Sequence, residues 1–244
     1  MRVHVEKCDR FLSNHPLCGT KIRRVYLHIE PGLKKPQTTN DNQAKTKKTM
    51  RRIKKAAHEQ FVTNGLEGTR IETIATRSGV NKALIYRHFG SRENLYRKVL
   101  EDAYHKVRVA EAKLALPPDP FEALEQLVSF TFEYYVANPD FLALVGVENL
   151  NHGKHLSQIS IDELKISSLR NILADIISKG QETEVFRDEL RQDSLYMMVS
   201  GLCWFTVATA HSFSITFEVD ILERKKLDQR KLEIIDAVFR FVRK

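Results

Sequence analysis

Apolar residues between positions 70 and 90 recur at the spacing of two short helices. Ile71, Ile74 and Ala75 fall on one face of the first helix, and Ile85 and Phe89 share one face of the second. An apolar face on so short a helix must rest on another element. We therefore expect both helices to pack inside a small helical domain.

Capping residues divide this segment into helix, turn and helix. Thr69 followed three residues later by Glu72 predicts a capping box, so the first helix should begin at about Arg70. Gly79 suits the left-handed position that ends a helix, and Asn81 is a favoured N-cap for the next. The pattern is typical of a helix-turn-helix, whose second helix enters the major groove of DNA.

The outward face of the second helix carries the side chains expected to contact DNA. Lys82 can donate to guanine, while Ala83 and Leu84 can pack on a thymine methyl group. The remaining candidates are better placed for phosphate groups, which set the register of binding. The expected DNA-binding residues are Thr69, Arg70, Lys82, Ala83, Leu84, Tyr86, Arg87, His88 and Arg92. The plainer alternative is a solvated charged face with Tyr86 as a packed aromatic.

A longer pattern surrounds the helix-turn-helix, and its matching positions are Ala57, Phe61, Gly65, Thr69, Ile74, Ala75, Gly79, Val80, Lys82, Ile85 to Phe89 and Ser91 to Leu95. Over residues 46–100 this pattern resembles the tetracycline-repressor (TetR) family. Arg70 departs from it, because the family often has a small hydroxyl residue there.

The resemblance implies an all-α dimeric transcription factor, usually a repressor. Its N-terminal three-helix domain would hold the helix-turn-helix, and its C-terminal helical domain would bind a small-molecule inducer and dimerise. The implied partners are a palindromic operator in double-stranded DNA, a second copy of the chain and an inducer of unknown identity.

Charge and polarity divide the chain into three parts. Residues 1–55 carry 15 Lys and Arg against 4 Asp and Glu, and residues 37–48 are polar without apolar periodicity. We expect a poorly structured basic extension over 1–45, the DNA-binding domain over 46–92 and the ligand-binding and dimerisation domain over 93–244. Because the first helix of the TetR family normally starts close to the beginning of the chain, one hypothesis is that part of the extension comes from a start codon chosen too far upstream. If the extension belongs to the protein, its Lys and Arg residues are candidates for a basic arm along a neighbouring minor groove.

Caps and prolines predict further helices behind the helix-turn-helix. Ser91 starts one that runs to about residue 115, and Asp119 with Pro120 starts a central one that ends before Pro139. A shorter helix should cover residues 140–150. A second capping box, formed by Ser160 and Glu163, should start the next helix. This helix should run to Ser178, and Gly180 should end it.

Residues 194–217 contain no formally charged side chain, over a length that could span a bilayer. One third of these residues are polar and the flanks lack a positive-inside pattern, so we expect a buried helix and no membrane partner. By the resemblance, this helix and a second one over residues 229–242 form the dimer interface.

A small-molecule site is expected among the helices that span residues 100–211, because pockets in helical bundles are apolar with a few polar groups. An inducer there would act by favouring the conformer with separated recognition helices. The candidate ligand-binding residues are Tyr104, Phe130, Tyr134, Phe141, Asn149, His152, Trp204 and Val207. For each of them, a role in core packing alone is the alternative.

Other classes of function are disfavoured. The chain has no glycine-rich phosphate loop, nucleophile elbow or metal-ligand spacing, so we expect no enzyme activity, cofactor or metal. Cys8, Cys18 and Cys203 are too scattered for a disulfide framework. Charged residues interrupt any secretory signal at the start, so a cytoplasmic location is expected. The rival within the same fold is a ligand-independent architectural or protein-recruiting factor, whose C-terminal domain would be too tightly packed to hold a pocket.

Overall fold

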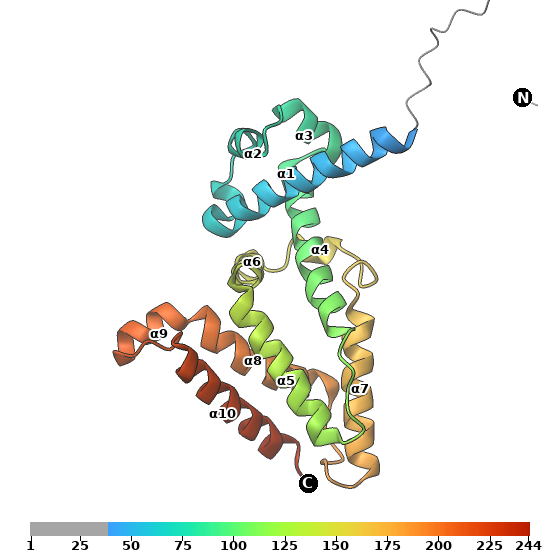
Figure 1. The fold of residues 1–244 in the computed structure, drawn as a ribbon, viewed down its shortest axis with the longest axis vertical. Coiled ribbons are helices and arrows are strands. Elements are labelled where there is room, and N and C mark those ends of the chain that lie inside the picture. Colours follow the sequence, from blue (N-terminus) through green and yellow to red (C-terminus); the bar gives the residue numbers. More distant parts are fainter. Residues whose placement is uncertain (1–38) are drawn as a thin grey trace, which may run out of the picture. The chain divides into compact units, whose positions relative to one another are not determined.

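The computed structural model describes residues 39–244, and it is all-helical there, as the sequence predicts (Figure 1). Residues 42–244 form one compact unit. Residues 1–38 of the extension predicted over residues 1–45, with its two cysteines, lie outside the described residues. The boundary between the two domains at residues 92 and 93 remains a prediction.

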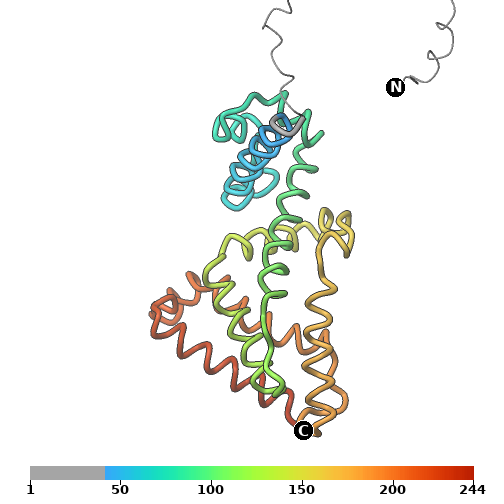
Figure 2. Tube along the Cα trace, turned by 45° about the vertical axis from the view of Figure 1, so that its right-hand side comes forward, coloured from blue at the N-terminus to red at the C-terminus, as the bar shows by residue number. Residues whose placement is uncertain are grey.

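Four helices make up the N-terminal part: α1 (Thr39–Gly68), α2 (Ile71–Ser78), α3 (Lys82–Phe89) and α4 (Arg92–Glu111). Their apolar faces meet in a core that includes Phe61, Ile74 and Ile85, each with at most 1% of its surface exposed. Helix α4, green in Figure 2, is continuous from the helix-turn-helix into the C-terminal bundle. It therefore connects the predicted DNA-binding domain to the predicted ligand-binding domain.

Helix α1 begins earlier than expected. Its first turns lie at residues 39–45, where the sequence predicts poor structure. The side chains of residues 42–48 are all exposed, so this part of the helix needs no apolar stripe. The hydroxyls of Thr46 and Thr49 donate to the carbonyl oxygens four residues earlier, at 2.9 and 3.0 Å. An exposed helix leaves no apolar periodicity for a sequence pattern to detect.

The caps around the turn are partly as predicted. Gly79 takes the left-handed conformation (φ 63°, ψ 39°), and the Asn81 side chain accepts a hydrogen bond from the Leu84 amide at 2.8 Å. The expected capping box of Thr69 with Glu72 is wrong, because Arg70 occupies the N-cap position and no side chain caps α2.

The C-terminal part is a helical bundle around α5. Its elements are α5 (Pro120–Ala137), α6 (Pro139–Leu150), the short 3₁₀ helix η1 (Leu156–Gln158), α7 (Ile166–Glu182), α8 (Gln192–Ala208), α9 (Ala210–Phe217) and α10 (Arg224–Val242). Helix α5 contacts α4, α6, α7, α8 and α10, so it is central, as predicted (Figure 1). Asp119 caps it through the amides of Phe121 and Glu122, at 2.9 Å each.

Other predicted helix ends also differ from the structure. Helix α10 starts at Arg224 rather than at residue 229. Helix α4 ends at Glu111 rather than near residue 115. Ser160 and Glu163 do exchange hydrogen bonds, but they close only a turn, because Lys165 is left-handed (φ 55°) and α7 starts after it. Gly180 lies within α7 and does not end it; a Cβ atom there would come within 2.1 Å of the Phe186 ring. This glycine serves close packing, a tertiary requirement that the local sequence does not reveal.

The uncharged segment 194–217 is not one buried helix. It breaks near Thr209, and α8 and α9 are bent by 67° relative to each other. Within residues 39–244 no single helix is long and apolar enough to cross a membrane, although this bent pair has the length and composition to do so. Large apolar side chains are exposed along this segment: Met197, Trp204, Phe205, Ile215 and Phe217.

Candidate DNA-binding interface and ligand pocket

Helix α3 exposes one face to solvent and packs the other against the domain core. Ile85 and Phe89 are buried, while Lys82, Ala83, Tyr86 and Arg87 are exposed. The exposed fractions of the Lys82 side chain and of Tyr86 are 64% and 46%. The four exposed residues lie where the sequence expects DNA contacts, on a helix whose start is fixed by the Asn81 cap.

The turn between α2 and α3 has a support that sequence reasoning missed. The Arg52 guanidinium on α1 donates to the carbonyl oxygen of Ser78 at 2.5 Å and to that of Gly79 at 3.4 Å. Both acceptors belong to the C-terminal end of α2, where backbone carbonyls lack helical partners and the dipole favours a cation. Arg52 therefore links the turn between α2 and α3 to α1.

Lys82 already has an anionic neighbour. Its Nζ lies 3.4 Å from Oε1 of Glu72 on α2, and both side chains are exposed. The pKa of Glu72 is lowered, first by a hydrogen bond from its own backbone amide and then by Lys82. An exposed pair of this kind is weak and screened by salt, so Lys82 can exchange Glu72 for a DNA acceptor.

Two of the residues expected to contact phosphates, Thr69 and Arg92, make hydrogen bonds within the protein. Thr69 is fully buried and its hydroxyl donates to the carbonyl oxygens of Gln60, at 3.1 Å, and Gly65, at 2.6 Å. It locks the α1–α2 connection and does not face solvent, so it is not a phosphate ligand in this conformation.

Arg92 belongs to the same connection. Its guanidinium donates to the Thr69 carbonyl oxygen at 3.3 Å and to Glu67 at 3.2 Å, while Nε donates to Glu93 at 3.3 Å. Only 26% of the side chain is exposed. The guanidinium is therefore largely committed to joining α4 to the loop before α2. The sequence pattern could not distinguish this role from phosphate binding, because both need a cation.

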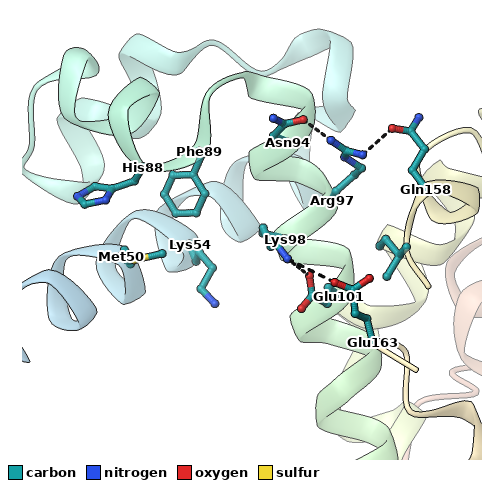
Figure 3. A pocket seen from close by; sticks show the side chains of 11 residues that line it. Met50, Lys54, His88, Phe89, Asn94, Arg97, Lys98, Glu101, Gln158 and Glu163 are labelled. Atoms are coloured by element: carbon teal, nitrogen blue, oxygen red, sulfur yellow. Dashed lines mark hydrogen bonds and ion pairs between the residues drawn. The ribbon is translucent and has the colours of Figure 1, made fainter. Parts of the chain in front are cut away.

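The other three expected residues differ in exposure. Arg70 is exposed at the N-cap of α2, as a phosphate contact requires, whereas Leu84 and His88 are half-buried. His88 lines a hollow of about 350 Å³ among α1, α3, α4 and residues 158–163 (Figure 3).

The same hollow shows how the DNA-binding helices meet the C-terminal part. Arg97 on α4 donates to Asn94 and, at 2.6 Å, to Gln158 (Figure 3). Lys98 lies 2.6 Å from Glu101 and 4.0 Å from Glu163. These polar links join α4 to the loop that follows α6.

A buried hydrogen-bond network around Glu148 connects α6 to that loop. Both oxygens of the Glu148 carboxylate on α6 are engaged: Oε1 accepts from the amides of His155, at 2.6 Å, and Leu156, at 2.8 Å, and Oε2 lies 3.1 Å from His155 Nδ1. The His155 ring packs edge-on against Tyr96 of α4, which packs edge-on against Phe61 of α1. Burial, and then the nearby Glu148 carboxylate, raise the pKa of Tyr96. A continuous set of contacts therefore leads from α6 to α1.

A second hollow, of about 340 Å³, lies among α4, α5, α6 and α8. Four of the predicted ligand residues line it: Tyr104, Phe141, Asn149 and Trp204. Sequence reasoning missed the other six, which are Tyr135, Leu142, Val145, Tyr196, Ser200 and Gly201. Their spacing on α8 (196, 200, 201, 204) marks one helix face, but a core face has the same spacing.

The remaining four predicted ligand residues do not line this hollow. Phe130 packs on Tyr134, and Tyr134 packs edge-on against Phe141, so both belong to the aromatic layer next to it. Val207 is half-buried one turn beyond Trp204. His152 is exposed in the turn after α6, with φ 56°.

A buried ion pair adjoins the second hollow. Arg108 and Glu111 of α4 form a salt bridge, and their side chains are 2% and 4% exposed. The Arg108 guanidinium also donates to the Tyr196 hydroxyl at 3.3 Å. Burial raises the pKa of the Glu111 carboxyl, and the guanidinium opposes that rise. The pair brings Tyr196 into a polar cluster at the back of the hollow.

Known proteins similar to this chain are transcriptional regulators. The model "Bacterial regulatory proteins, tetR family" matches residues 53–99, and the model "Tetracyclin repressor-like, C-terminal domain" matches residues 120–238. The HTH-type transcriptional repressor NicS of Pseudomonas putida is 35% identical over 81% of this chain and 93% of its own length. The HTH-type transcriptional repressor SCO4008 of Streptomyces coelicolor is 29% identical over 65% of this chain and 79% of its own length.

Solved structures share the fold. The transcriptional regulator SCO4942 of Streptomyces coelicolor has a TM-score of 0.60, with 20% identity over 80% of this chain and 98% of that one. The fatty acid degradation regulator FadR of Bacillus halodurans has a TM-score of 0.57, with 17% identity over 78% and 94%. The two family models and the identity to NicS establish that the chain belongs to the TetR family of bacterial transcriptional regulators.

Proposed function

We propose that this protein is a cytoplasmic, homodimeric repressor that binds a palindromic DNA operator and leaves it when a small molecule binds the C-terminal domain. The observation that carries the proposal is the exposed face of α3, with Lys82, Ala83, Tyr86 and Arg87 on a helix capped by Asn81. Lys82 and Ala83 are the base readers, and Tyr86, Arg87 and Arg70 contact phosphates.

Dimerisation is supported by the apolar side chains that α8 and α10 leave exposed. Met197 and Phe205 of α8 and Leu232 of α10 are each more than half exposed. Exposed apolar surface of this kind is typical of an interface. A second copy would cover it and would place two copies of α3 on half-sites about 34 Å, or a multiple of that, apart.

Release by a ligand is supported by the hollow next to α6 and by the contacts that lead away from it. Phe141 and Asn149 line the hollow, and Glu148 between them belongs to the buried network that reaches Tyr96 and Phe61. A ligand that shifts α6 therefore shifts α4, and it releases DNA to the extent that it prefers the released conformer. A ligand-independent factor would have no need of such a hollow.

The experiment is selection of bound duplexes from a random pool by the full-length protein, followed by the same selection with Lys82→Ala. The wild type should select a palindrome, and the variant should lose preference at one position in each half-site because it loses a base contact. Lys179→Ala on α7, outside the proposed DNA-binding and dimer surfaces, is the control and should select the wild-type consensus. Binding without a consensus would refute sequence-specific regulation, and an asymmetric consensus would refute the dimer.

A further inference from the structure

The hollow among α4, α5, α6 and α8 has a lining of one chemical kind. Five of its ten residues are aromatic: Tyr104, Tyr135, Phe141, Tyr196 and Trp204. The others are aliphatic, glycine, or neutral polar groups supplied by Asn149 and Ser200. Among the described residues, no formally charged side chain lines this hollow.

Two phenol groups of the lining, those of Tyr104 and Tyr135, are neutral. Burial raises the pKa of Tyr104 to about 12 and also raises the pKa of Tyr135, so neither hydroxyl ionises at neutral pH. The Tyr196 hydroxyl accepts a hydrogen bond from Arg108 at 3.3 Å, and a phenol O–H is also a donor. The lining therefore offers several neutral donors and acceptors to a ligand.

The adjacent cation is already compensated. Arg108 is paired with Glu111, and both side chains are almost fully buried. A ligand carboxylate would add a third charge to this neutral pair, and burying an unpaired charge is strongly unfavourable. The ion pair thus orients Tyr196 without creating a site for an anion.

We propose that the hollow binds a compact, uncharged, planar aromatic molecule that carries a hydrogen-bonding substituent. The five aromatic rings in the lining favour stacked or edge-on contact with a ligand ring. The volume of about 340 Å³ lies at the lower end of ligand pockets and limits the molecule to one or two rings. The inference rests on the proposed function, because it names the ligand class of the inducer site.

The test compares three small probes of one shape: benzamide, its anionic counterpart benzoate, and the saturated cyclohexanecarboxamide. Trp204 is the one tryptophan of the chain and lines the hollow, so its fluorescence reports occupancy directly. Calorimetry on the same full-length protein gives an independent dissociation constant. Benzamide should bind saturably, benzoate at least about tenfold more weakly, and the saturated amide at least about threefold more weakly.

Two variants locate the binding. Val145 lines the hollow from α6, so Val145→Phe should fill it and abolish the benzamide response. Leu150→Phe on the exposed side of the same helix is the matched control and should bind as the wild type does. Tyr104→Phe keeps the ring and removes one hydroxyl, so it tests the site without a change in packing volume and should weaken benzamide severalfold.

The inference is overturned if benzoate binds as tightly as benzamide, if the saturated amide binds equally well, or if benzamide does not bind. It is also overturned if Val145→Phe and Tyr104→Phe both bind benzamide like the wild type. Failure of the proposed function would look different, because DNA selection by the same preparation would then yield no consensus.

Discussion

The helix-turn-helix and the α8–α9 segment differ in what determines their structure. In the former, Gly79 and Asn81 set the turn through local backbone conformation and capping. In the latter, an uncharged run that reads as one buried helix instead bends by 67° and exposes Phe205, Ile215 and Phe217. Local signals suffice where a segment makes its own hydrogen bonds, and they fail at the exposed apolar surface that the proposed dimer would bury.

The largest expected effect lies in the bundle. Glu111→Gln leaves the buried Arg108 without its counter-charge and should destabilise the protein by about 3–5 kcal/mol in urea unfolding. The double variant Arg108→Met with Glu111→Leu removes both charges and should lose much less. A loss below about 1 kcal/mol for Glu111→Gln would mean that the pair is solvated.

The next effect separates structural from DNA-binding roles. Thr69→Val removes a buried hydroxyl that donates hydrogen bonds to two backbone carbonyl oxygens. The free energy of unfolding should therefore fall by about 1–3 kcal/mol. The salt dependence of DNA binding should stay unchanged, because no phosphate contact is lost. Arg87→Ala should instead make the negative slope of log affinity against log salt shallower, by about 0.9 per half-site. A reduced slope for Thr69→Val would restore it as a phosphate ligand.

A smaller effect tests the caps. Asn81→Ala removes the side-chain acceptor at the start of α3 and should destabilise the protein by about 1 kcal/mol. Glu72→Gln, at the position where the sequence suggests a capping box, should leave thermal stability almost unchanged because no cap exists there. Equal losses from the two variants would indicate that α2 does have a side-chain cap.

The smallest effect concerns pH. Hydrogen bonds from Arg224 and Lys231 of α10 lower the pKa of Glu133 on α5. The folded protein therefore binds this proton less readily than the unfolded chain does. The resulting stability is present above the unfolded pKa and is lost as pH falls through the lower folded pKa. Glu133→Gln should reduce the difference in melting temperature between pH 6 and pH 3.5; an unchanged difference would show that the contact is too exposed to matter.

The fold and part of the site follow from the sequence. Caps and prolines predict most helices, and the α3 face predicts the exposed residues Lys82, Ala83, Tyr86 and Arg87. Thr69 and Arg92 bond backbone carbonyls in the structure, which the sequence does not reveal, because a hydroxyl or a guanidinium serves a backbone carbonyl as well as a phosphate. Their contacts with DNA stay predictions. Only four of eight ligand candidates line the hollow, because aromatic residues at helical spacing look alike whether they face a cavity or a core.

The central claim is that two copies of one reading helix act together on DNA. The direct measurement is native mass spectrometry of the protein bound to its selected duplex. The same measurement is made with a second duplex in which one half-site is scrambled, and with the interface variant Phe205→Glu on the intact duplex. Two copies should bind the intact duplex, while scrambling a half-site or introducing Phe205→Glu should sharply reduce occupancy. One copy bound with full affinity and full sequence preference would contradict the account.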